Sequence, residues 1–505
     1  MSELSLSLVS HTNVGKTTLA RTLLGRDIGE VRDATHVTEL ADAHLLVESA
    51  AGDRLRLWDT PGFGDSVRLA RRMRRQGQPL GWLLSEVWDR WRDRPFWASQ
   101  QALRHVRDDS DVVLYLVNAA EAPAAAGYVA PEMELLAWVG KPVIVLLNQL
   151  GAARTAAEDA ADIEAWRAHL APHPLVKAVL PLDAFSRCWL QEGLLLGQIA
   201  AVLAGEPALA MQRLHAAWAH QRLATFDHSI ALLATGLGSA AAARVTVADG
   251  AGVRGRLRQL GGALGLPGAE REAEPQQIAQ QELAAALAEA SRTDTTRLIA
   301  LHGLDGQAQA DIEALLDQPF DHRQKLPEGR AAVLGGAVTG ALAGLKADVL
   351  SGGLTLGGGL IAGGLIGALG AASLARGINV VRGTGSSWVA WNAEALDALA
   401  EAALMRYLAV AHFGRGRGAW VRGEPPAHWR SAVQQALSTQ AGALATVWRG
   451  RSTRHDTGDD ATVLARELRP LLHAATRDAL ERLYPGAWPR AGEPAGLGDP
   501  PQSPS

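Results

Sequence analysis

Residues 4–19 read LSLSLVSHTNVGKTTL, and this stretch decides the fold of the N-terminal part of the chain. Leucine alternates with serine in its first half, as expected of a strand that buries one face. A loop with Gly15, Lys16 and Thr17 follows, and then a helical pattern. Strand, loop and helix in this order are the context of the motif G-x-x-x-x-G-K-[ST], although Ser10 replaces its first glycine. The stretch therefore predicts a phosphate-binding loop.

The chemistry of such a loop assigns roles to its residues. Backbone N–H groups surround phosphate oxygens at the start of a helix. A lysine must also reach the β and γ phosphates and a hydroxyl must bind Mg²⁺, and Lys16 and Thr17 supply these groups. The residues predicted to contact the phosphates are Asn13, Val14, Gly15, Lys16, Thr17 and Thr18.

A second motif, DTPG at residues 59–62, ends a strand predicted over residues 54–59. In this Asp-x-x-Gly pattern the carboxylate of Asp59 holds Mg²⁺ through water, and the N–H of Gly62 senses the γ phosphate. Between the two motifs, the polar segment 32–40 is expected to supply another hydroxyl to Mg²⁺, from Thr38 or, as the alternative, Thr35. The predicted catalytic residues are Lys16, Thr38 and Gly62, and the predicted metal ligands are Thr17, Thr38 and Asp59.

Strand and helix patterns alternate through the first 180 or so residues, which predicts a mostly parallel α/β sheet. The apolar runs 112–117 and 143–147 are typical of central strands buried on both faces, and residues 176–180 form the last strand. Helices are expected over 131–139 and, after a capping box at Thr155, up to about residue 170. Beyond residue 185, helical patterns such as 276–290 and 391–411 predict a mainly α-helical domain.

The motifs NVGKTT and DTPGFGD, with the threonine segment between them, resemble the Era and TrmE group of translation-factor-class P-loop GTPases over roughly the first 188 residues. More narrowly, the chain resembles bacterial proteins that join such a GTPase to a C-terminal helical domain of unknown function. The resemblance implies GTP and GDP as ligands, Mg²⁺ as cofactor, and a K⁺ site that involves Asn13. It also implies that another group positions water, because Phe63 stands where Ras-like enzymes have a catalytic glutamine.

The elements that resemble base-recognition motifs depart from the family pattern. Residues 148–151 read NQLG where the family has Asn-Lys-x-Asp, so Gly151 replaces the carboxylate that pairs with guanine. Guanine selectivity is therefore expected to be reduced. Asp183 is a candidate for a displaced partner of the base. The residues predicted to lie at the base are Asn148, Gln149, Asp183 and Ala184.

Residues 64–110 form an insertion after the second motif. Between residues 67 and 107 there are ten arginines against three acidic residues, interleaved with four tryptophans. Four interpretations stay open: a helical pair packed on the domain with solvated arginines, a contact with a partner or second protomer, an anionic membrane surface, or RNA.

Residues 331–376 are rich in glycine and almost uncharged. Between Asp348 and Arg376 there are 27 uncharged residues, nine of them glycine, which is long enough to span a bilayer. Glycines at four-residue spacing and arginines on both flanks predict a helical hairpin in or against a membrane, with both ends in the cytoplasm. A buried hairpin in a soluble domain is the alternative. The expected domains are 1–188, 189–330, the hairpin 331–376, 377–490 and a disordered tail 491–505.

Composition limits the classes of function. A net charge of -4 over 505 residues does not fit a general nucleic-acid binder, so no DNA partner is expected and RNA stays open. The single Cys188 and an N-terminus without a signal-peptide pattern favour the cytoplasm. The chain is thus expected to be a Mg²⁺-dependent GTPase that switches at the cytoplasmic face of the inner membrane, with lipid, a membrane protein or a second protomer as partner. The alternatives are a nucleotide-sensing scaffold that does not hydrolyse and a ribosome-associated or RNA-associated GTPase.

Overall fold

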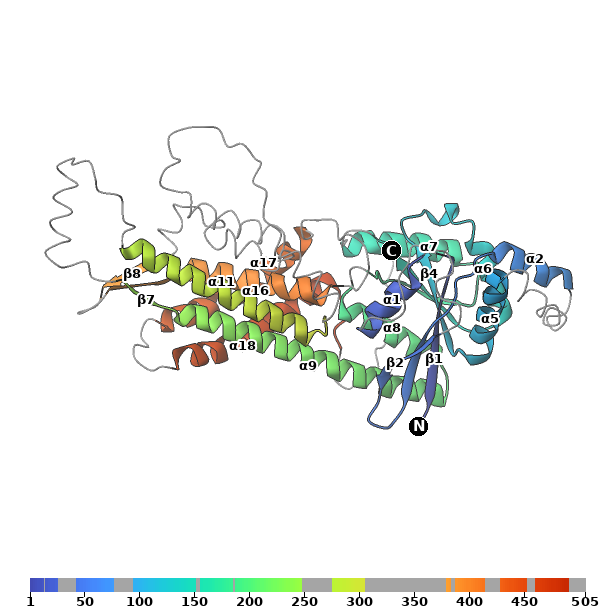
Figure 1. Cartoon of the computed structure of the whole chain (residues 1–505), viewed down its shortest axis with the longest axis horizontal. Helices are drawn as coiled ribbons and strands as arrows, with labels where there is room; N and C mark the ends of the chain where they lie inside the picture. The colour runs from blue at the N-terminus through green and yellow to red at the C-terminus, as the bar shows by residue number, and fades with distance from the viewer. Residues whose placement is uncertain are drawn as a thin grey trace, which may run out of the picture. The chain divides into compact units, whose positions relative to one another are not determined.

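The structure is a computed structural model, and it divides into two compact units (Figure 1). The first holds the described residues of Met1–Thr225, Ala411–Gly423 and Glu481–Ser505, and the second those of Phe226–Val410 and Glu424–Leu480. The residues that the structure describes are 1–12, 14–25, 42–76, 94–150, 155–184, 187–247, 275–304, 378–382, 387–413, 427–451 and 459–489.

A six-stranded sheet forms the centre of the first unit, in the order β2-β3-β1-β4-β5-β6. Its strands are β1 (Glu3–Ser10), β2 (Asp42–Glu48), β3 (Arg54–Asp59), β4 (Val112–Asn118), β5 (Val143–Asn148) and β6 (Val176–Pro181). All neighbours are parallel except β2, which pairs antiparallel with β3. The predicted mostly parallel α/β sheet is confirmed. The carboxyl ends of the five parallel strands share one edge, where ligands bind in such sheets.

Helices cover both faces of this sheet. They are α1 (Lys16–Leu24), α2 (Ser66–Gln76), α5 (Arg94–Asp109), α6 (Val129–Val139), α7 (Ala156–Leu170) and α8 (Trp189–Val202). Alternate β4 residues, including Val113 and Tyr115, share one buried cluster with apolar side chains of α2, α5, α6 and α7. The intervening Leu114 and Leu116 are buried on the opposite face. The prediction that this central strand is buried on both faces is therefore confirmed.

The predicted capping box is present at the start of α7. The Thr155 side chain accepts a hydrogen bond from the backbone N–H of Glu158, and the Glu158 carboxylate accepts one from the N–H of Thr155. This arrangement satisfies backbone N–H groups that have no partner within the helix, which is why the helix begins here.

The second unit is mainly helical, as predicted for the C-terminal part. Its long helices are α11 (Pro275–Leu301), α16 (Ala393–Ala411), α17 (Ala427–Gly450) and α18 (Asp460–Leu483), and α9 (Glu206–Ala242) contributes its residues from Phe226 onward. Gly238 of α9 lies so close to α18 that a Cβ atom there would meet the Ala461 carbonyl oxygen at 2.7 Å. Glycine therefore permits the close packing of these two helices.

The second unit also contains a small antiparallel sheet that the sequence analysis missed. It has the order β7-β9-β8, formed by β7 (Val245–Val247), β9 (Ser387–Trp391) and β8 (Ile378–Arg382). The expectation of a helix from Trp391 was wrong at its first residues, because Trp391 ends β9 and Asn392 precedes α16. The Asn392 side chain accepts a hydrogen bond from the N–H of Ala395 at 2.8 Å, which caps the helix there.

Several predictions fall on residues outside the described ranges. These are Asn13, Thr35, Thr38, Gly151, the middle of the arginine-rich insertion (77–93), the glycine-rich segment and the tail. Of the helices in the part of the chain that the structure describes, none combines the length and apolar character needed to cross a membrane. The boundaries expected at residues 188, 330 and 376 stay predictions.

Candidate functional site

The phosphate-binding loop joins β1 to α1 at the ligand-binding edge of the sheet. Gly15 precedes the helix with a φ of 94°, a left-handed conformation that favours glycine. A Cβ atom on Gly15 would also lie 2.8 Å from Nδ2 of Asn148. Glycine is thus required at this position for both its backbone conformation and its size.

Lys16 points into the loop that it follows. Its side chain is only 9% exposed, and Nζ donates a hydrogen bond to Oγ of Ser10 at 3.0 Å. The serine that replaces the first motif glycine thus contacts the lysine. Burial lowers the pKa of Lys16, while the carboxylates of Asp59 and Glu132 oppose this shift. Phosphate oxygens would further favour the charged form of the lysine.

Thr17, in the first turn of α1, meets Asp59 at the carboxyl end of β3. Oγ1 of Thr17 donates a hydrogen bond to Oδ2 of Asp59 at 2.6 Å. A hydroxyl and a carboxylate side by side are oxygen ligands of the kind that Mg²⁺ takes, alongside water and nucleotide phosphates. These two residues therefore fit a nucleotide-bound Mg²⁺. The third predicted ligand, Thr38, is not among the described residues.

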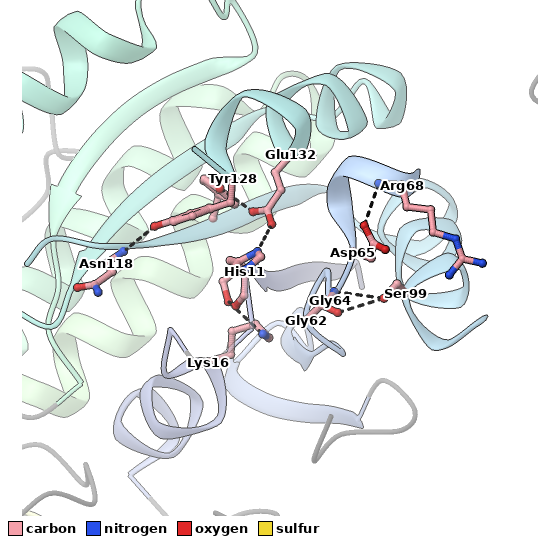
Figure 2. A network of polar contacts seen from close by, with 12 residues as sticks. His11, Lys16, Gly62, Gly64, Asp65, Arg68, Ser99, Asn118, Tyr128 and Glu132 are labelled. Atoms are coloured by element: carbon pink, nitrogen blue, oxygen red, sulfur yellow. Dashed lines mark hydrogen bonds and ion pairs between the residues drawn. The ribbon is translucent and has the colours of Figure 1, made fainter. Parts of the chain in front are cut away.

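Gly62 lies against the phosphate loop. A Cβ atom on Gly62 would be 3.0 Å from Nζ of Lys16 and 3.3 Å from Cα of Thr12, so any larger residue would crowd the loop. Ser99 of α5 donates a hydrogen bond to the Gly62 carbonyl oxygen and accepts one from the N–H of Gly64, both at 3.4 Å (Figure 2). The inserted helix α5 thus contacts the turn that carries Gly62.

Phe63 follows Gly62, and its side chain takes no part in the site. Its N–H donates to the Ser10 carbonyl oxygen at 3.1 Å, and its ring is fully buried in the core with Leu69 and Phe96. The side chain at this position therefore cannot orient a water molecule.

The base-side residues hold loops together. Nδ2 of Asn148 donates to the Val14 carbonyl oxygen at 2.7 Å, and its Oδ1 accepts from the N–H of Ala184 at 2.9 Å. Oδ2 of Asp183 accepts from the N–H of Leu150 at 2.6 Å. Asn148 is fully buried. Its amide therefore joins the phosphate loop to the loop after β6.

The structure brings most of the predicted site residues to one edge of the sheet. Thr18 lies in the first turn of α1, and Gln149 follows β5 with a φ of 60°, in the left-handed region. Thr22 of α1 donates to the Ala184 carbonyl oxygen at 2.8 Å, which fixes that loop from a second side.

The sequence analysis missed His11, Tyr115 and Glu132, which form a network beside the phosphate loop. Figure 2 shows the contact between His11 and Glu132. Glu132 is buried, which raises the pKa of its carboxyl group, although the contacts with His11 and Tyr115 oppose the shift. The sequence showed only two acidic residues, Glu132 and Glu134, within an otherwise apolar helix, and this pattern identifies no partner for either.

Comparison with known families agrees with this geometry. Residues 5–149 match the family described as 50S ribosome-binding GTPase, and the N-terminal part of the chain is a P-loop GTPase domain. Residues 170–468 match a second family, which covers more than half of the chain. The protein belongs to this family, whose description is Domain of unknown function (DUF3482).

Solved structures that match part of the chain include two of Era. One is an Aquifex aeolicus Era variant bound to GDP.AlF4-, with 19% identity, a TM-score of 0.31, and coverage of 41% of this chain and 58% of that one. The other is Era with MgGDPNP and a 16S ribosomal RNA fragment, with 20% identity, a TM-score of 0.31, and coverage of 41% and 59%. The chain thus spans less than two thirds of these structures. Among curated proteins, no match is found.

Proposed function

We propose that the chain binds GTP and GDP together with Mg²⁺ and hydrolyses GTP to GDP and phosphate. One observation carries the proposal: the residues for phosphate and metal chemistry come from separate motifs and meet at one edge of the sheet. Oγ1 of Thr17 lies 2.6 Å from Oδ2 of Asp59, and Gly62 lies against Nζ of Lys16. A P-loop GTPase domain at residues 5–149 supports the same function.

Each residue has a distinct part in the proposed reaction. Lys16 stabilises negative charge on the β and γ phosphates, and the N–H of Gly62 contacts the γ phosphate. Thr17 and Asp59, with Thr38, would hold Mg²⁺, which supplies neutralisation of phosphate charge when bound. Because the Phe63 side chain is buried, the attacking water must be oriented by backbone groups or by a partner. We therefore expect the isolated chain to hydrolyse GTP slowly.

A nucleotide-sensing scaffold without hydrolysis is the second candidate, and the buried Phe63 favours it. Phosphate release from GTP by the purified full chain distinguishes the two functions. Turnover of GTP that requires Mg²⁺ supports the enzyme. A comparison of the turnover rate with and without K⁺ tests the K⁺ site proposed at Asn13. Tight binding of GTP without turnover supports the scaffold.

We further propose that the protein acts as a switch at the cytoplasmic face of the inner membrane. The sequence pattern of residues 331–376 supports this role, since a long uncharged stretch has arginines on both flanks. Fractionation of the intact protein with high-salt and carbonate washes tests the proposal. Recovery of the whole protein without detergent, as one monodisperse species, would contradict it, and its size would decide whether a homodimer forms. RNA that co-purifies would support the ribosome-associated alternative.

A further inference from the structure

A buried carboxylate on α6 lies next to the phosphate loop. One oxygen of Glu132, Oε1, lies 2.9 Å from Nδ1 of His11, and the other, Oε2, accepts a hydrogen bond from the Tyr115 hydroxyl at 2.7 Å. A carboxylate inside a protein is costly unless hydrogen bonds satisfy it, and here both oxygens have partners. Of these partners, only His11 belongs to the loop that meets phosphate.

The His11 imidazole is held on two sides. Its ring stacks on Tyr128, with the centroids 4.8 Å apart and the planes at 20°. The Tyr128 hydroxyl in turn accepts a hydrogen bond from the N–H of Asn118, at the end of β4. Figure 2 shows the His11 side chain directed toward Glu132 and not toward Lys16. His11 is therefore placed to orient the loop and not to contact the reacting phosphate.

The loop has a particular need for such an anchor. Its first motif glycine is replaced by Ser10, and the residue after His11, Thr12, has backbone atoms 3.3 and 3.5 Å from the place where a Cβ of Gly62 would be. A small displacement of residues 10–12 would therefore change the space between the loop and Gly62, where the γ phosphate is expected.

We propose that Glu132, acting through His11, is a positioning residue of the phosphate loop that holds residues 10–12 in the geometry needed for the γ phosphate. The inference rests on the proposed function, because it concerns the same site. It predicts that loss of the contact weakens binding of GTP more than binding of GDP, which has no γ phosphate.

Equilibrium binding of GTP and GDP with Mg²⁺ to the full-length protein tests this proposal, with the melting temperature of each variant measured in parallel. His11 is 35% exposed, so His11→Ala is expected to fold. We expect this variant to bind GTP roughly tenfold more weakly and GDP within about twofold of the wild type. His11→Gln, whose amide keeps an N–H donor for the carboxylate, should recover most of the loss.

Two further variants separate positioning from simple core stability. In a Glu132→Leu background, which leaves no acceptor for the His11 ring, His11→Ala should have less than about a twofold further effect, because the two residues act through one contact. Tyr115→Phe removes the other partner of the same carboxylate, so it should lower the melting temperature but leave GTP affinity within about twofold.

Each result has a clear meaning. Wild-type affinity for GTP in folded His11→Ala, or an equal loss in Tyr115→Phe and His11→Ala, would overturn the positioning role while the proposed function stands. Absence of GTP binding in the wild type would overturn the proposed function, and this inference with it.

Discussion

The phosphate side and the base side of the site differ in what their side chains do. At the phosphate side, Thr17 donates a hydrogen bond to Asp59, and the charge of Asp59 acts on the buried Lys16, so the three side chains lie where the ligand is expected. At the base side, Asn148 and Asp183 make short hydrogen bonds to the backbone of neighbouring loops. The contacts that hold the loops are thus kept, whereas Gly151 replaces the carboxylate that reads guanine in the family pattern. Holding the loops of the site in place and selecting the base therefore depend on different residues.

The largest effect is expected at the phosphate side. Lys16→Ala and Asp59→Ala each remove a charge that faces phosphate or metal, so GTP affinity with Mg²⁺ should fall by roughly 100-fold or more. Lys177→Ala is the matched control, because Lys177 is exposed at β6 and its Nζ donates a hydrogen bond to the Pro174 carbonyl oxygen. Isothermal titration measures all three, and normal affinity in both site variants would end the P-loop interpretation.

The next largest effect is expected at Asn148. Its replacement by alanine leaves the Val14 carbonyl oxygen and the Ala184 N–H without this partner, at a cost of about 1 to 3 kcal/mol. Because the residue joins loops, Asn148→Ala should lower the melting temperature and weaken GTP and ATP binding alike. Asn118→Ala, at the paired position of β4, should have a smaller effect on both nucleotides. A loss confined to GTP would show that Asn148 reads the base.

The base preference should be moderate and open to improvement. We expect the wild type to prefer GTP over ATP less than GTPases with an Asn-Lys-x-Asp motif do. Gly151→Asp restores the carboxylate, so it should raise the ratio of GTP to ATP affinity by about tenfold. Competition binding with the two nucleotides measures this ratio. Strong rejection of ATP by the wild type, with no change in the variant, would mean that another residue selects the base.

The smallest effect on nucleotide binding is expected at the turn between β2 and β3, at the opposite end of β3 from Asp59. There Arg213 of α9 donates two hydrogen bonds to Asp53, at 2.6 and 3.2 Å. These bonds hold the pKa of the Asp53 carboxyl well below its usual range, against the opposing effect of burial. Arg213→Ala should lower the melting temperature and leave GTP affinity within about twofold.

The sign of the Asp53 shift also predicts a pH dependence. A carboxyl group whose pKa is lower in the folded state stabilises the fold above its unfolded pKa of about 3.9, and this contribution is lost as the pH falls below that value. Melting curves between pH 6 and pH 3 should therefore show a larger loss in the wild type than in Arg213→Ala. Parallel curves for the two proteins would contradict this assignment.

The sequence predicted those elements whose signal lies within a few neighbouring residues. The apolar runs that became β4 and β5 and the capping box at Thr155 lie within a few residues, and the sequence shows them directly. The contact between His11 and Glu132 joins residues 121 positions apart, so no local pattern could identify it. The strand Ser387–Trp391 is different: its partner β7 is distant in the sequence, but its partner β8 ends at Arg382, close enough for a local strand pattern, so this pair was missed although it is local.

Binding of GTP and ATP to the full-length wild type, each with and without Mg²⁺, tests the central claim most directly. The account predicts that both nucleotides bind and that binding of each requires Mg²⁺, because Lys16, Thr17 and Asp59 lie together at the phosphate side. It also predicts that GTP is preferred only moderately, because Gly151 replaces the carboxylate that reads guanine. Absence of binding by either nucleotide, or binding that does not respond to Mg²⁺, would contradict the account.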